Sequence, residues 1–144
     1  MKILCMEDQE DKFCHIKNVL NKFSVELEWK KNCQEGLFIL RNKAYDYLLL
    51  DMTMPFCKDE VSKENYDSFA GKEVLREIKR KKYPIKVIVV TGFSDFEKGK
   101  ELITLKELIE EIQTEYSDYY IGYVKYDSTS VEWQERLIML LNLE

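Results

Sequence analysis

The stretch Tyr47-Leu48-Leu49-Leu50-Asp51 decides the fold, because an unbroken apolar run ends directly in a carboxylate. Two similar runs, Ile3 to Met6 and Val87 to Val90, lie on either side of it in the sequence. Nearly continuous apolar residues, without polar alternation, are typical of parallel strands covered on both faces. The three runs are therefore predicted to be the central strands of a parallel sheet.

Two further strands and five helices complete the predicted pattern. Val25 to Trp29 alternates apolar and acidic residues, which indicates an edge strand, and Tyr119 to Lys125 supplies a fifth strand. Helical spacing of apolar residues covers residues 13–23, 34–42, 74–78, 102–112 and 129–141, the last opening on a predicted capping box at 129–132. This alternation predicts an α/β fold, a doubly wound five-stranded parallel sheet with helices on both faces.

Length and composition indicate a single domain over residues 1–144. The chain has 144 residues, 45% of them hydrophobic, enough for a core without disulfides. Its net charge of -5 argues against direct binding of nucleic acid. Four widely spaced cysteines form no Cys-x-x-Cys pair, so they indicate neither a zinc site nor a redox motif.

The sequence also predicts no membrane segment and a cytoplasmic location. No apolar stretch reaches the roughly 18 residues that span a bilayer, and the N-terminus lacks signal-peptide architecture. Two segments are enlarged for so compact a plan, at about residues 56–70 and 96–119. The first is either a binding loop or an insertion, and the residues alone leave both open.

Polar side chains follow the predicted strands at the edge where ligands bind in doubly wound sheets. Carboxylates, a hydroxyl and an ammonium should meet there, from Glu7, Asp8, Asp51, Thr91 and Lys125. Crowded carboxylates repel unless a cation intervenes, and oxygen ligands suit Mg²⁺. Asp51 can then act as a nucleophile towards phosphorus, with Thr91 and Lys125 as donors to phosphoryl oxygens.

Each of these residues has a simpler interpretation when taken alone. Acidic residues after a strand often cap the next helix, and Thr91-Gly92 is compatible with an ordinary turn. Their common position at one end of separate strands nevertheless favours a joint site.

Together, these segments resemble the receiver domains of two-component response regulators. Residues 2–8 resemble the first strand with its acidic pair, residues 44–55 the phosphoacceptor segment with its Met-Pro, and residues 71–79 the following helix. Residues 86–92 resemble the strand that carries the hydroxyl residue, and residues 123–125 the strand that carries the basic one. The resemblance implies a flavodoxin-like sheet with strand order 2-1-3-4-5.

The resemblance also implies a function. Asp51 would accept a phosphoryl group from a sensor histidine kinase or a phosphotransfer protein, with Mg²⁺ held by Asp8, Asp51 and the backbone carbonyl of Thr53, assisted by Glu7. Output would pass through residues 95–141 to a separate downstream effector protein, because no second domain follows. The chain would be no enzyme beyond self-phosphorylation from a phosphodonor and slow self-dephosphorylation. The slow loss of phosphate is predicted from Phe93, which stands two residues past Thr91, where it could screen the acyl phosphate from water.

Two residues depart from the family pattern beside Lys125. Tyr126 stands where a proline usually follows the lysine, and Gly122 replaces an aromatic residue three positions before it. Because side chains alternate along a strand, Tyr123 should face the opposite way from the usual aromatic residue. These departures favour an alternative, a pseudo-receiver that binds partners irrespective of phosphorylation.

A further alternative is a haloacid-dehalogenase-like phosphatase, which also uses a nucleophilic aspartate and Mg²⁺. It requires a second aspartate two residues later as the acid and base, and Thr53 stands there. The missing second aspartate argues against the phosphatase, and retention of the five strand-end residues together argues against the pseudo-receiver.

Overall fold

A computed structural model describes residues 1–57, 70–92, 95–98 and 101–143. Its elements follow the chain in the order β1 (Lys2–Met6), α1 (Glu10–Leu20), β2 (Glu26–Lys30), α2 (Cys33–Asn42), β3 (Tyr47–Leu50), α3 (Ala70–Lys81), β4 (Lys86–Thr91), β5 (Asp95–Lys98), β6 (Glu101–Thr104), α4 (Leu105–Glu115), β7 (Tyr120–Lys125) and α5 (Glu132–Leu140). The five predicted strands are confirmed as β1, β2, β3, β4 and β7.

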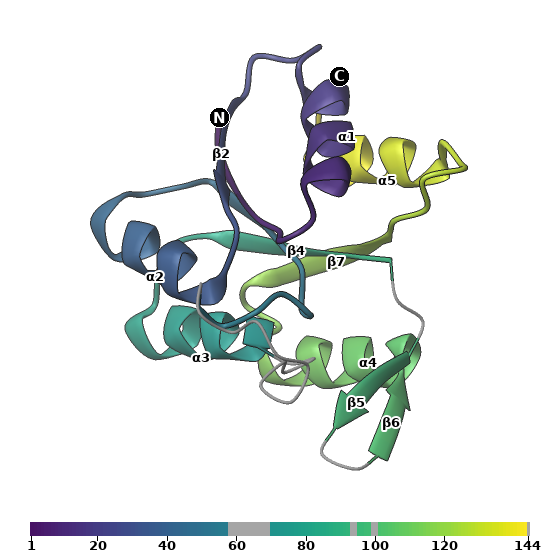
Figure 1. Cartoon of the computed structure of the whole chain (residues 1–144). Coiled ribbons are helices and arrows are strands. Elements are labelled where there is room, and N and C mark those ends of the chain that lie inside the picture. Colours follow the sequence, from purple (N-terminus) through teal and green to yellow (C-terminus); the bar gives the residue numbers. More distant parts are fainter. Residues whose placement is uncertain (58–69, 93–94, 99–100, 144) are drawn as a thin grey trace.

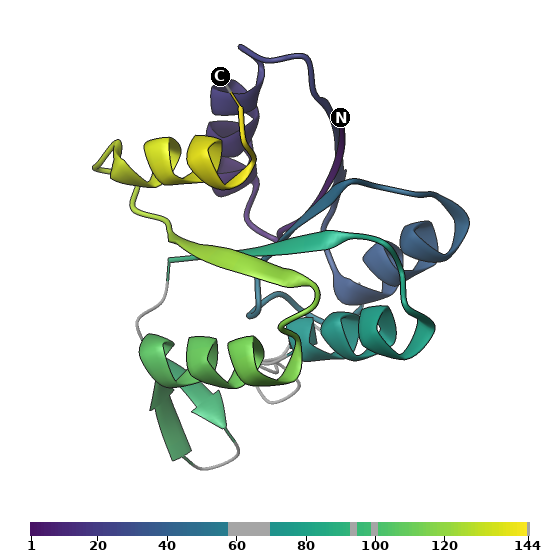
Figure 2. The same cartoon turned by 180° about the vertical axis from the view of Figure 1, so that it is seen from behind.

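These five strands form one parallel sheet in the order β2-β1-β3-β4-β7. With β7 as the fifth strand of the sheet, this confirms the doubly wound, flavodoxin-like order 2-1-3-4-5. Helices α1 and α5 cover one face, and α2, α3 and α4 cover the other (Figures 1 and 2). Strand β2 lies at an edge and is only partly buried, as its alternating sequence predicted.

The apolar run in β3 explains why both faces need covering. Leu48 and Leu50 belong to the core cluster on the side of α2, α3 and α4, whereas Leu49 belongs to the cluster on the side of α1 and α5. Full burial of such a side chain stabilises the fold by about 1.5–3 kcal/mol. A strand that contributes to two cores therefore has no polar position.

The predicted start of the fourth helix is wrong. Leu102 lies in β6, which pairs antiparallel with β5, and α4 begins only at Leu105. Thr104 is the N-cap of α4, and its hydroxyl oxygen accepts the N–H of Glu107 at 3.2 Å. This cap fixes the helix start, because the residues before it are extended.

The predicted capping box of the last helix is also wrong. Val131 occupies the N-cap of α5 and provides no side-chain hydrogen bond. Thr129 instead donates its N–H and its hydroxyl to Asp127, at 2.9 and 2.7 Å. An aspartate two residues upstream thus binds the threonine in a turn before the helix begins.

The two enlarged segments differ in what the structure describes. The segment at 96–119 contains most of the β5–β6 hairpin and all of α4. In the segment at 56–70, residues 58–69 lie outside the described residues, as does Phe93. Among the helices that the structure describes, none has the length and apolar character needed to cross a membrane.

Candidate functional site

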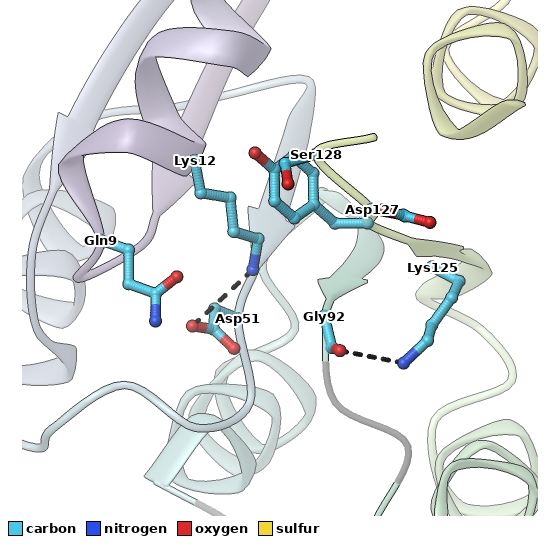
Figure 3. A pocket seen from close by; sticks show the side chains of 8 residues that line it. Gln9, Lys12, Asp51, Gly92, Lys125, Asp127 and Ser128 are labelled. Carbon is cyan, nitrogen blue, oxygen red and sulfur yellow. Dashed lines mark hydrogen bonds and ion pairs between the residues drawn. The ribbon is translucent and has the colours of Figure 1, made fainter. Parts of the chain in front are cut away.

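The predicted acidic cluster is present at the carboxyl edge of the sheet. Each of Glu7, Asp8 and Asp51 offers a carboxylate oxygen that lies within 4.8 Å of the other two. Glu7 and Asp51 are buried, and Asp8 is half-buried. Asp51 also opens onto a cavity of about 460 Å³, which is lined by Gln9, Lys12, Asp51, Gly92, Lys125, Tyr126, Asp127 and Ser128 (Figure 3).

Strand register and neighbouring backbone bring these carboxylates together. Met6 pairs with Leu50, so the residues that follow β1 and β3 emerge side by side, and the Asp51 N–H donates to the Met6 carbonyl at 3.0 Å. The Trp29 indole donates to the Glu7 carbonyl at 2.7 Å. The backbone at the end of β1 is thereby held from both neighbouring strands.

Thr53 fixes the orientation of the Asp51 carboxylate. Its backbone N–H and its hydroxyl both donate to Oδ1 of Asp51, at 3.1 and 3.0 Å. All of these groups are buried. The second carboxylate oxygen, Oδ2, faces the ammonium of Lys12 at 3.9 Å.

Lys12 is a site residue that the sequence predictions missed. Its side chain is only 4% exposed, and its Nζ lies 2.6 Å from Oε2 of Glu7 and donates to the Val90 carbonyl at 2.9 Å. A signal was present in the sequence, since Lys12 stands four and seven residues before Ile16 and Val19, on the apolar face of α1. A charged residue at an apolar position of a helix indicates a buried charge pair.

The electrostatics of the cluster are dominated by burial and by mutual repulsion. Burial raises the pKa of Glu7 above its usual value, Asp51 raises it further, and Lys12 opposes the rise. Burial and then Asp51 likewise raise the pKa of Asp8. Burial lowers the pKa of Lys12, but Asp51 and Glu7 together outweigh it, so the net change is a rise. The ammonium therefore stays charged, while the carboxylates are short of positive charge.

Thr91 and Lys125 reach the same edge but do not both point at Asp51. They pair in register at the ends of β4 and β7, and Thr91 is fully buried. The Lys125 ammonium donates to the Gly92 carbonyl at 3.0 Å. In Figure 3 the Lys12 ammonium points towards Asp51, whereas that of Lys125 points towards Gly92.

The two departures beside Lys125 have visible structural consequences. No cis peptide bond occurs in the described residues, and Tyr126 donates its N–H to the Thr91 carbonyl at 2.7 Å. Its ring packs edge-on against Trp133 of α5, with centroids 5.0 Å apart, and its hydroxyl bonds Nδ1 of His15 on α1. Tyr126 thus ties the site loop to both helices on that face.

A side chain at Gly122 would displace Leu140 of α5. A Cβ placed there would lie 2.8 Å from a methyl group of Leu140, so the end of that side chain would have to shift. Tyr123, by contrast, packs against the cluster on the side of α4, and its carbonyl accepts the Nε–H of Arg136 at 2.6 Å. The two neighbours therefore face opposite sides of β7, as strand alternation predicted.

The residues present fit a divalent metal. Three carboxylates and one ammonium leave a formal charge of -2 in a mostly buried cluster. The donors are all oxygen, and Asp8 is half-exposed, so water can complete a coordination shell. Hard, oxygen-rich sites of this kind suit Mg²⁺.

The fold and this site together define a receiver. The chain matches the response regulator receiver domain family over residues 3–108. That is most of its 144 residues, and the chain belongs to this family.

Relatives of known sequence include an uncharacterized protein, y4jR, from Sinorhizobium fredii, which is 30% identical over 93% of this chain and 92% of its own length. The Detocs response regulatory protein DtcB from Enterobacter cloacae is 30% identical over 65% of each chain. The second alignment thus leaves about a third of both proteins unmatched.

Solved structures support the same fold. The response regulator TrrA of Thermotoga maritima, in complex with Mg²⁺-BeF, has a TM-score of 0.62 at 24% identity and covers 96% of this chain and 97% of its own. A CheY-like receiver from Methanospirillum hungatei has a TM-score of 0.66 at 19% identity, covering 98% and 90%.

Proposed function

We propose that this receiver accepts a phosphoryl group on Asp51 and relays that change to a partner protein. The observation that carries the proposal is the cluster of Glu7, Asp8 and Asp51, with Asp51 opening onto the cavity. We expect the phosphodonor to be a sensor histidine kinase or a phosphotransfer protein. We expect the downstream partner to be a separate effector protein. Both exchanges would take place in the cytoplasm.

Asp51 is prepared for this reaction before a donor arrives. Thr53 holds Oδ1 with two hydrogen bonds, so the carboxylate cannot rotate freely. An oxygen of Asp51 forms the new bond to phosphorus, the bond from phosphorus to the donor histidine breaks, and the imidazole nitrogen keeps the electron pair. The product is an acyl phosphate on Asp51.

Asp8, Asp51 and the Thr53 carbonyl, assisted by Glu7, are the proposed ligands of Mg²⁺. The metal would supply positive charge to the phosphoryl oxygens. A related structure, that of TrrA, contains Mg²⁺-BeF, which supports the metal as part of the proposal. Thr91 and Lys125 are the proposed donors to the phosphoryl group, and Lys125 would have to leave Gly92 to reach it.

A pseudo-receiver remains the second candidate, because specific observations favour it. The Lys125 ammonium points away from Asp51, and Gly122 packs directly under Leu140, where the family usually has an aromatic residue. A haloacid-dehalogenase-like phosphatase is less well supported. Thr53 donates its hydroxyl to Asp51, and an alcohol at that position is a poor general acid.

Intact mass after incubation with acetyl phosphate tests the proposal. We expect an adduct of one phosphoryl group that requires Mg²⁺ and disappears in Asp51→Asn. Asp46→Asn is the matched control, because Asp46 precedes the same strand, is exposed, and accepts the Lys2 backbone N–H at 2.8 Å, at the opposite edge of the sheet. It should keep the adduct.

The outcomes separate the candidates. An adduct in the wild type and in Asp46→Asn, but not in Asp51→Asn, supports the receiver. Folded wild-type protein without any adduct supports the pseudo-receiver. Continuous release of inorganic phosphate at many turnovers per chain would instead support the phosphatase.

A further inference from the structure

The Lys12 ammonium lies beside two of the three carboxylates of the acidic cluster. Nζ lies 2.6 Å from Oε2 of Glu7 and 3.9 Å from Oδ2 of Asp51, and it donates a hydrogen bond to the Val90 carbonyl at 2.9 Å. Helix α1 carries the side chain inward from its first turn, and Lys12 is almost fully buried. The ammonium is therefore fixed in place by three elements of the sheet edge.

The charge of Lys12, more than its bulk, accounts for its presence. Its position belongs to the apolar stripe of α1, where Ile16 and Val19 are buried, so an apolar side chain would satisfy packing there. Burying an ammonium is costly unless it is paired and hydrogen-bonded. In this cluster it neutralises one of three neighbouring carboxylates.

We propose that Lys12 is an internal countercation that competes with Mg²⁺ for Glu7 and Asp51. This inference rests on the proposed function, because it concerns the metal of the same site. Two of the three carboxylates in the cluster already share the ammonium. A dication held by the same groups meets a positive charge at close range, so its binding is weakened. Lys12 thereby keeps the site ordered without metal and sets the Mg²⁺ concentration at which the site fills.

Two tryptophans allow metal binding to be followed without any phosphodonor. The Trp29 indole donates to the Glu7 carbonyl, and Trp133 packs against Tyr126, whose ring centroid lies 5.8 Å from the Lys12 Nζ. The chain contains no other tryptophan. Intrinsic fluorescence during a Mg²⁺ titration therefore reports on the cluster from two sides, and isothermal titration calorimetry gives an independent dissociation constant.

The experiment compares Lys12→Met with Lys17→Met in metal-stripped protein. Methionine keeps an unbranched side chain, one atom shorter than that of lysine, and removes the charge, and Lys17 is an exposed lysine on the same helix. We expect Lys12→Met to bind Mg²⁺ at least about tenfold more tightly than the wild type, because a unit charge within a few ångström is removed from a buried site. Lys17→Met should stay within about twofold. Lys12→Arg, which keeps the charge, should remain near the wild type.

The outcomes distinguish this inference from the proposed function. Equal or weaker Mg²⁺ binding in folded Lys12→Met, with an acetyl-phosphate adduct still forming in the wild type, overturns the role of Lys12 alone. Tighter binding without an adduct in any variant overturns phosphoryl acceptance and leaves the role of Lys12 standing. No Mg²⁺ binding in any variant overturns both. If Lys12→Met does not fold by circular dichroism, Lys12→Gln replaces it in the same titration.

Discussion

Two buried glutamates in this protein have opposite surroundings. Glu7 lies at the carboxyl edge of the sheet and is 1% exposed, and Glu77 lies in the second half of α3 and is 5% exposed. Burial and Asp51 raise the pKa of Glu7, whereas hydrogen bonds from Arg41 lower the pKa of Glu77 despite its burial. Two glutamates with similarly low exposure thus have pKa values that are changed in opposite directions.

Burial is the main cause of the raised pKa of Glu7, whereas positive partners are the main cause of the lowered pKa of Glu77. Glu77 accepts two hydrogen bonds from Arg41, at 2.5 and 3.0 Å, and one from the Tyr83 hydroxyl at 3.1 Å, and Arg80 lies 3.8 Å away. Two guanidinium groups thus face this one carboxylate. Glu7 shares one ammonium with Asp51, and Asp8 adds a third carboxylate to the same cluster. The first arrangement clamps α2 to α3, and the second leaves negative charge available for a ligand.

We call Glu7, Asp8, Asp51 and Lys12 the crowded cluster. The largest expected effect comes from removing its cation, Lys12. Lys12→Met should lower the free energy of unfolding in metal-free buffer by about 3 kcal/mol, because it leaves buried carboxylates without a partner. Mg²⁺ should restore a large part of this loss, since a dication replaces the missing charge. Urea denaturation with EDTA and with Mg²⁺ measures both quantities.

We call Glu77, Arg41, Arg80 and Tyr83 the balanced cluster. Arg41→Met is the matched change in this cluster. It should destabilise the protein less, because Tyr83 and Arg80 still face Glu77, and Mg²⁺ should not restore the loss. An equal response of the two variants to Mg²⁺ would contradict the distinction between the clusters.

The next effect concerns the balanced cluster itself. Glu77→Gln should cost about 2 kcal/mol at pH 7, because hydrogen bonds to a charged carboxylate are lost. The pKa of Glu77 is lowered by Arg41 in the folded protein. A carboxyl whose folded pKa is lowered contributes stability above its unfolded pKa, and this stability disappears as the pH falls through the folded value.

The difference in stability between the wild type and Glu77→Gln should therefore be largest near neutral pH. It should narrow as the pH falls below about 4.5, the ordinary value for a glutamate. Urea denaturation at pH 7, 5 and 3.5 measures this trend. A difference that stays constant over this range would show that the ionised carboxylate is not the stabilising form.

Sequence reasoning recovered the sheet because the sheet depends on local runs. Leu48, Leu49 and Leu50 face two cores, so their continuity alone identifies a central strand. The acidic cluster followed from the same logic, since parallel strands bring their carboxyl ends to one edge. The family resemblance added the strand order, which the pattern of runs does not contain.

Other features depend on contacts between distant segments and were missed. Leu102 fits a helical spacing, and only the pairing of β6 with β5 shows that it is in a strand. Lys12 was overlooked because lysines on helices are usually exposed, and its partners Val90 and Asp51 lie far along the chain. A lysine in a helix is informative only when its position is compared with the spacing of the apolar residues in the same helix.

The smallest expected effects distinguish two tyrosine hydroxyls at the borders of the clusters. The Tyr83 hydroxyl donates to the Glu77 carboxylate, and the Tyr126 hydroxyl bonds the exposed ring of His15. Tyr83→Phe should cost about 1.5 kcal/mol, because the lost bond involves a charged acceptor, and Tyr126→Phe about 0.5 kcal/mol. Urea denaturation at pH 7 measures both losses.

Tyr126→Phe should also leave Mg²⁺ affinity unchanged, because the ring, and not the hydroxyl, faces Lys12. Fluorescence titration of the variant checks this, with the wild type as reference. A shift in Mg²⁺ affinity beyond about twofold would mean that the bond from α1 to Tyr126 positions Lys12, which would extend the crowded cluster to His15. An unchanged affinity confines the cluster to the residues that contact the ammonium directly.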